Sequence, residues 1–196
     1  MLKNYAVRWT TRPDPDITCY DDYTDEHRSH ITIVNDALYR HAKLNIKYTA
    51  YDMQEEEDII YPKNHSGIMA LSSDNDNPHP YIYARVLDLF HVEVTNNASN
   101  AIRYASSKAV RLEMVWVQWY DYDEQIPSGF NHLRYPSITL CPDSNPASYG
   151  LLHPEDILRC AHLIPDSNLG SAPDDYHRVQ VNMWVGIHSP MTRPMY

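Results

Sequence analysis

The chain has 196 residues and a formal net charge of −10 at pH 7, which argues against binding of nucleic acid through the phosphate backbone and favours basic proteins or small molecules as partners. The length fits one domain with a substantial core. A hydrophobic content of 43%, with 16 Tyr and 4 Trp against 2 Phe, indicates a folded protein whose aromatic side chains are mostly amphipathic.

The N-terminus, MLKNYAVRWTTRPDPD, lacks the apolar core of a secretory signal, and no stretch approaches the length of a membrane span. Cys19, Cys141 and Cys160 lie far apart and form no C-x-x-C motif, which favours reduced thiols over a disulfide framework or a zinc finger. We therefore expect an intracellular protein, cytoplasmic or nuclear, that does not associate with membranes.

The first elements along the chain are short. Tyr5–Trp9 is predicted to be an edge strand within an irregular N-terminal extension, residues 1–30. A β-rich core over 31–188 then opens with a short helix predicted at Ile33–Leu44, where apolar residues recur every four positions. Leu44–Tyr51 alternates as a strand.

A long strand over residues 79–94 is predicted next, with two chemically different faces. One face is apolar, with Ile82, Ala84, Val86, Phe90, Val92 and Val94, and the other carries Tyr81, Tyr83, Arg85, His91 and Glu93. The segments 54–66, 72–80 and 95–107 are acidic or turn-rich and are predicted to be loops. Val110–Tyr120 is predicted to be a second long strand, in the middle of the sheet because its second half is apolar on both faces.

The C-terminal third completes the predicted sheet. Residues 121–148 are rich in Pro, Tyr and Asn and are predicted to form an ordered loop or short hairpin, and 153–156 to begin a one-turn helix. Strands are expected at 161–164 and 179–187, before a tail at 189–196. The predicted fold is a single α+β, β-rich domain, a twisted antiparallel sheet curling into a partly open barrel with one or two short helices.

Six segments in order carry a resemblance to a known family: LNIKYTAYD from Leu44, IMAL from Ile68, residues 79–94, LEMVWVQWY from Leu112, YGLLHPEDILRCAHLIP from Tyr149 and VNMWV from Val181. Together they resemble the C-terminal module of proteins encoded by Plavaka-type DNA transposons of basidiomycete fungi, in the Kyakuja-Dileera-Zisupton group. In that family the transposase core lies upstream of the module. The resemblance therefore implies ancestry but no transposition chemistry for any residue here, and a chain with its own Met is expected to stand alone.

The strand pattern has a second, weaker likeness. The Ala84-Arg85-Val86 strand, the VWVQW strand and the Ile157, Cys160, Leu163 series resemble the bromo-adjacent homology domain, a β-rich chromatin reader. The likeness concerns shape, and function must still be argued from particular residues.

Aromatic residues on the two long strands are candidates for a binding groove. If these strands are neighbours, Tyr81, Tyr83, Trp119 and Tyr120, with Arg85, line one cleft, and ring faces of this kind attract methylated lysine or another quaternary cation. The acidic chain would add long-range attraction for a basic tail. Trp116 shares a predicted face with apolar neighbours and is assigned to the core.

A metal site is the alternative interpretation of the same region. His91 and Glu93 point the same way on a strand and, with His162, could supply a 2-His-1-carboxylate set for one divalent metal ion. Because the chain has 11 histidines, an H-x-E pair with a distant histidine also arises by chance, and Arg85 could instead hold Glu93 in a salt bridge.

The other motifs in the sequence give little evidence of function. Residues 21–25 have the D-D-x-x-D form of terpene cyclases, but a solvated acidic loop explains them without that long helical fold. The chain has no G-x-S-x-G elbow, no H-E-x-x-H motif and only 5 glycines.

Two hypotheses of function follow. The first is a non-catalytic binding module without a cofactor, recognising a protein partner, such as a basic tail, through an aromatic and acidic groove. The alternative is a small enzyme recruited from the same scaffold to act on a small molecule, with His91, Glu93 and His162 holding a divalent metal ion at the floor of a pocket.

Overall fold

The computed structural model describes residues 1–11, 23–49, 54–64, 67–72, 80–99, 101, 108–123, 136–165 and 178–182, with only the backbone of 165 and 178–182. Two α-helices and ten strands occur in these ranges. The helices are α1 (Leu2–Thr10) and α2 (Asp25–Ser29), and the 3-10 turns are η2 (Pro62–Asn64), η4 (Pro146–Ser148) and η5 (Pro154–Asp156). The strands are β1 (Ile31–Arg40), β2 (Leu44–Thr49), β3 (Glu55–Ile60), β4 (Gly67–Leu71), β5 (Tyr81–Asn96), β6 (Val110–Tyr122), β7 (Ser137–Leu140), β8 (Tyr149–Leu152), β9 (Ile157–Pro165) and β10 (Arg178–Asn182).

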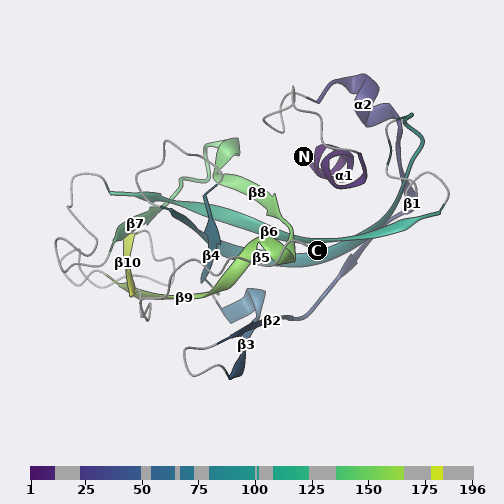
Figure 1. The fold of residues 1–196 in the computed structure, drawn as a ribbon. Coiled ribbons are helices and arrows are strands. Elements are labelled where there is room, and N and C mark those ends of the chain that lie inside the picture. Colours follow the sequence, from purple (N-terminus) through teal and green to yellow (C-terminus); the bar gives the residue numbers. More distant parts are fainter. Residues whose placement is uncertain are drawn as a thin grey trace.

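The main sheet has eight antiparallel strands in the order β1-β5-β4-β9-β10-β7-β6-β8, and β5 also pairs with β6. One end of the sheet therefore curls into a ring of pairings, β5-β4-β9-β10-β7-β6, which we call the strand ring. The far halves of β5 and β6 extend beyond it with β1, so the sheet as a whole is twisted and not closed into a barrel (Figure 1). The predicted β-rich fold with a twisted antiparallel sheet and short helices is confirmed.

A β-bulge in β5 determines which side chains share a face. Val86 pairs with Val117 and Asp88 with Trp116, so Leu87 is an extra residue on β5. Because alternation shifts by one residue at a bulge, the parity of the two faces changes there. The predicted faces of residues 79–94 are therefore wrong beyond Val86: Arg85 lies on the face opposite to His91.

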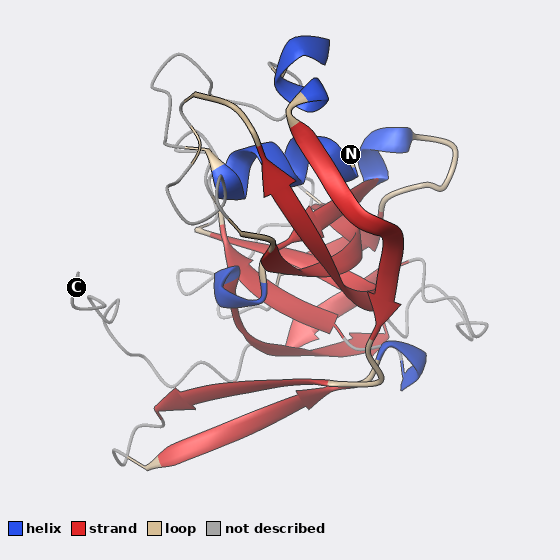
Figure 2. Cartoon of the chain, turned by 90° about the vertical axis from the view of Figure 1, so that its right-hand side faces the viewer, coloured by secondary structure: helices blue, strands red, loops and turns tan. Residues whose placement is uncertain are grey.

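We call the two sides of the β5–β6 pair the inner and the outer face. The inner face carries two buried clusters: Tyr83, Tyr120 and Ile138 inside the strand ring, and Val92, Val94, Leu112 and Met114 beneath α1. The outer face carries Ala84, Val86, Leu89, Val115 and Val117, which pack with Ile46 and Ile60 of the β2–β3 hairpin. Figure 2 shows this hairpin apart from the main sheet at the lower edge of the molecule.

The N-terminal segment is helical, so the edge strand predicted at Tyr5–Trp9 and the irregular extension over 1–30 are wrong for the described residues. Leu2, Tyr5, Ala6 and Trp9 recur at the i, i+3, i+4, i+7 spacing of one helical face, and they pack on the inner face of the sheet. The Tyr5 hydroxyl donates to the Glu113 carbonyl oxygen and ties α1 to β6.

Two further predictions of secondary structure are wrong. The helix predicted at Ile33–Leu44 is strand β1, whose pairing with β5 is interrupted by a bulge where Asn35 and Asp36 have positive φ. The loop predicted at 54–66 contains β3, because its acidic run pairs with β2 in full register. Tertiary pairing overrides local propensity in both places.

The other predicted strands agree with the structure where they are described, whereas β4 and β8 were not predicted and β7 lies in the loop or hairpin predicted at 121–148. β2, β5, β6 and β9 cover the strands predicted at Leu44–Tyr51, 79–94, Val110–Tyr120 and 161–164, and β10 covers the start of the one predicted at 179–187. The tail, residues 189–196, lies outside the described residues. No helix in the described part of the chain is long and apolar enough to cross a membrane.

Candidate functional site

The aromatic residues predicted to line a groove are mostly buried. Tyr83 is 1% exposed and Tyr120 is 8% exposed, both inside the strand ring, with Tyr81 packed against them. Burial raises the pKa of Tyr120 to about 12, and burial also raises the pKa of Tyr83. These two tyrosines are neutral core residues, so they cannot form an open groove.

Trp119 is separated from that cluster, whereas Arg85 adjoins it. Trp119 lies on the outer face, where its indole ring covers Gly150 so closely that a Cβ built there would be 2.6 Å from a ring carbon. Arg85 lies on the inner face opposite Gln118 and is half-buried. The five residues predicted for binding therefore do not converge on one surface.

Trp116, which the sequence assigns to the core, is 39% exposed. It lies on the inner face between the cluster covered by α1 and the cluster inside the strand ring, where neither covers the sheet. Tyr149 of β8 is its diagonal neighbour, because Gln118 pairs with Tyr149 and Trp116 with Leu151. The Trp116 and Tyr149 ring centroids are 6.2 Å apart at an interplanar angle of 41°.

A carboxylate contacts Tyr149 and also Gln118, which is two residues from Trp116 on the same face. Oδ1 of Asp143 accepts from the Tyr149 hydroxyl at 3.0 Å and from Nε2 of Gln118 at 2.7 Å, while no described residue donates to Oδ2. The bond to Asp143 raises the pKa of Tyr149. We call Trp116, Tyr149 and Asp143 the aromatic–acidic surface, since they present two ring faces and one carboxylate together.

A second group of polar residues surrounds His91. Its Nδ1 lies 2.6 Å from Nε2 of His41, so one of these nitrogens donates to the other, and we call the two residues the histidine pair. Tyr39 stacks on the His91 ring, with centroids 4.8 Å apart and an interplanar angle of 12°. His41 follows β1, and its backbone N–H donates to the Leu89 carbonyl oxygen, which fixes the chain beside β5.

The predicted metal set is not assembled. His91 and Glu93 do share the outer face of β5, but His162 of β9 is level with Val86 and two strands away, since Gly67 pairs with both Ala161 and Arg85. The separation along the strands is about five residues, or roughly 16 Å. In the described ranges no group of three or more His, Cys, Asp or Glu side chains is placed to hold a metal ion.

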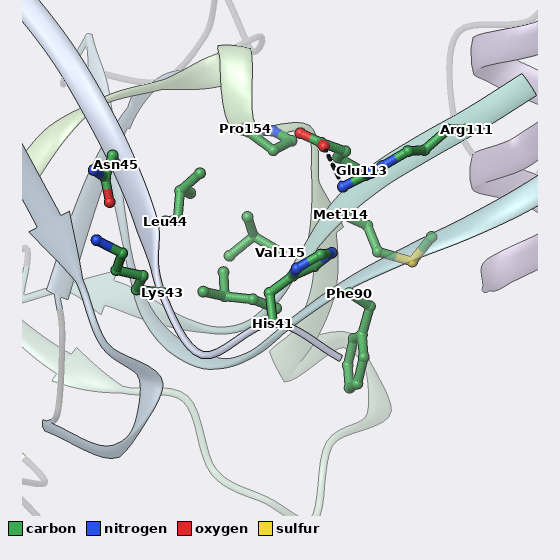
Figure 3. Close-up of a pocket in the computed structure, with 11 residues that line it drawn as sticks. His41, Lys43, Leu44, Asn45, Phe90, Arg111, Glu113, Met114, Val115 and Pro154 are labelled. Atoms are coloured by element: carbon green, nitrogen blue, oxygen red, sulfur yellow. Dashed lines mark ion pairs between the residues drawn. The ribbon is translucent and has the colours of Figure 1, made fainter. Parts of the chain in front are cut away.

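The histidine pair borders a pocket of about 310 Å³. Figure 3 shows Lys43 and Arg111 on opposite sides of this pocket, with His41 and Val115 between them, and the ion pair of Arg111 with Glu113. The pocket is also lined by Leu44, Asn45, Leu89, Phe90, Met114 and Pro154. We call it the histidine pocket.

The protonation of His91 makes stability depend on pH. Burial, then Arg111 and His41, lower the pKa of His91 below 6.5, while Glu113 and Glu93 act in the opposite direction. As pH falls below about 6.5, the unfolded chain binds a proton that the folded chain does not, so stability decreases; at higher pH both states are neutral and the effect vanishes. We expect the urea midpoint of the wild type to fall more steeply between pH 7 and pH 5 than that of His91→Gln. Equal slopes would contradict this assignment.

Sequence reasoning missed His41, Tyr149 and Asp143, because their proximity to residues on β5 and β6 depends on strand pairing. The one local indication was that Tyr39 and His41 alternate as they would on a strand. The helical spacing of the apolar residues around them favoured a helix instead.

Comparison with known proteins adds no assignment, since no family model, no curated protein and no solved structure matches this chain.

Proposed function

We propose that this protein is a non-catalytic binding module that recognises a cationic side chain in a basic segment of a protein partner. The observation that carries the proposal is the exposed Trp116 ring beside Tyr149 and the Asp143 carboxylate. Lysine, methylated lysine or arginine would lie against the rings. The metal site of the small-enzyme alternative is not favoured, because His162 lies two strands away from His91 and Glu93.

The chemistry of the aromatic–acidic surface suits a cation. An aromatic face attracts an ammonium or guanidinium group, with tryptophan the strongest of the side chains, by about 0.5 to 2 kcal/mol depending on desolvation. Oδ2 of Asp143 adds a carboxylate acceptor that no described residue occupies. The net charge of −10 attracts a basic segment at long range and raises its rate of association at low salt.

Peptide titration of the full chain tests this proposal. We expect a lysine-rich peptide and its trimethyllysine form to bind the wild type, and a matched peptide with glutamine at every lysine not to bind. Trp116→Ala should weaken binding about tenfold, because it removes the larger of the two rings. Calorimetry gives the affinity, and the indole N–H signal of Trp116 in a ¹H–¹⁵N spectrum gives the location.

Tyr39→Ala is the matched control, since Tyr39 is an exposed aromatic residue on the outer face, opposite to Trp116. It should bind the peptides as the wild type does. Equal binding of the lysine and glutamine peptides, or unchanged binding by Trp116→Ala, would show that this surface does not recognise a cation.

A further inference from the structure

The histidine pocket differs in charge from the rest of the molecule. His41 lines it and also lines an adjacent pocket of about 470 Å³. Four cationic side chains and two carboxylates line the two pockets, an excess of two positive charges in a chain that carries −10. The cations are Arg40, Lys43, Lys63 and Arg111, and the carboxylates are Asp88 and Glu113. An anion is therefore attracted here and repelled over much of the remaining surface.

The cations differ in their pairing. Nε of Arg40 donates to Oδ1 of Asp88 at 2.8 Å, and its Nη2 forms an ion pair with Oδ2 at 2.8 Å. Nη2 of Arg111 lies 3.0 Å from Oε1 of Glu113. Lys43 makes no ion pair or hydrogen bond with any described residue. Both carboxylates are already engaged, so the unneutralised charge of the histidine pocket is that of Lys43.

The histidine pair can offer a hydrogen-bond donor to an anion in the pocket without gaining or losing a proton. When Nδ1 of His91 donates to Nε2 of His41, the other nitrogen of the His41 ring carries a hydrogen. His41 lines the pocket, so an anion in it would favour this tautomer. Stacking of Tyr39 on His91 restricts the orientation of the pair.

The rest of the lining is apolar and comes from the edge of the core. Leu44, Leu89 and Val115 border the pocket beside the charged groups. A volume of about 310 Å³ is at the lower end of the range for small-molecule sites, which combine an apolar body with a few polar groups.

We propose that the histidine pocket binds a small organic carboxylate, with the carboxylate between Lys43 and His41 and the hydrocarbon body against Leu44, Leu89 and Val115. This site is separate from the aromatic–acidic surface, which lies on the opposite face of the β5–β6 pair. The histidine pocket favours an anion, whereas the aromatic–acidic surface favours a cation. The chain therefore has one surface for a cation and one pocket for a carboxylic acid.

Two pairs of probes test the ligand class by calorimetry on the full chain at pH 7. Benzoate and hexanoate are expected to bind in a saturable manner, and benzamide and hexanamide, which have the same bodies without the charge, are not. A peptide with a free C-terminal carboxylate and its amidated form distinguish a peptide terminus from a free acid. Binding of inorganic phosphate as tight as that of benzoate would overturn the assignment to carboxylates.

Variants locate the site. Lys43→Met keeps the length of the side chain and removes its charge, and it should weaken benzoate binding about fivefold, the loss expected for one partly exposed ion pair. Lys47→Met, at an exposed position of β2 outside the pocket lining, should leave affinity unchanged. Trp116→Ala should also bind benzoate normally, so failure of the cation site does not affect this test. Unchanged affinity in Lys43→Met, or no saturable binding by the wild type, would overturn the proposal.

Discussion

Tyr83→Ala is expected to lower the free energy of unfolding by about 3 to 5 kcal/mol, the range for truncating a large aromatic side chain in a core. Tyr83 is 1% exposed and packs with Tyr120 and Ile138 inside the strand ring. The ring is closed by strand pairing on every side, so its interior cannot collapse around a cavity without breaking strand pairs. Urea denaturation followed by circular dichroism measures the effect.

Tyr83→Phe is the matched control, since it keeps the ring and removes only the hydroxyl. It should cost about 1 kcal/mol, the net value of one hydrogen bond. The pair of variants also separates two roles for this residue. If Tyr83 lined a groove, alanine would abolish binding of a ligand and leave stability nearly unchanged; a loss below about 1 kcal/mol for Tyr83→Ala would contradict the core assignment.

Strands that alternate over many residues could be predicted from the sequence. β2 and the first half of β6 alternate with period two, and the second half of β6 is apolar on both faces, as expected for a strand inside the sheet. The twisted antiparallel fold follows in turn, because several such strands with one apolar face must pack against another layer.

Short elements could not be predicted in the same way. The five residues Tyr5–Trp9 satisfy both a strand and a helix pattern, and only packing of α1 on the inner face decides between them. The spacing in Ile33–Leu44 satisfied a helix pattern, yet the backbone groups of β1 pair with β5. The acidic run in β3 looks like a loop because local propensity ignores its partner strand β2.

The candidate sites could be predicted only in part, because they depend on register. His91 was identified from its strand, but its partner His41 is 50 residues away in sequence. Trp116 was assigned to the core by alternation, and it is exposed because α1 and the strand ring cover the inner face on either side of it. The local sequence pattern does not predict which parts of the inner face α1 and the strand ring cover. It also does not predict the β6–β8 pairing that brings Tyr149 to Trp116.

Deletion of Leu89 is expected to prevent folding or to cost at least about 4 kcal/mol, a loss that few single changes produce. Leu89 is 4% exposed and pairs with Val115 on the outer face. If the rest of β5 keeps its register with β6, Leu87 then takes the place opposite Trp116, and Asp88 takes the buried place opposite Val115. The core loses a leucine and gains a carboxylate separated from Arg40, and each of these changes costs about 2 kcal/mol or more.

Deletion of Leu87 is the control, because it also shortens β5 by one residue but removes the extra residue of the bulge. Val86 and Asp88 then pair with Val117 and Trp116 as before, so every side chain keeps its face and this variant should lose far less stability. Dispersion of the ¹H–¹⁵N spectrum and the urea midpoint distinguish the two variants. Equal losses in the two deletions would mean that Leu87 is not the extra residue of β5. The assignment of Trp116 and the histidine pair to opposite faces would then be wrong.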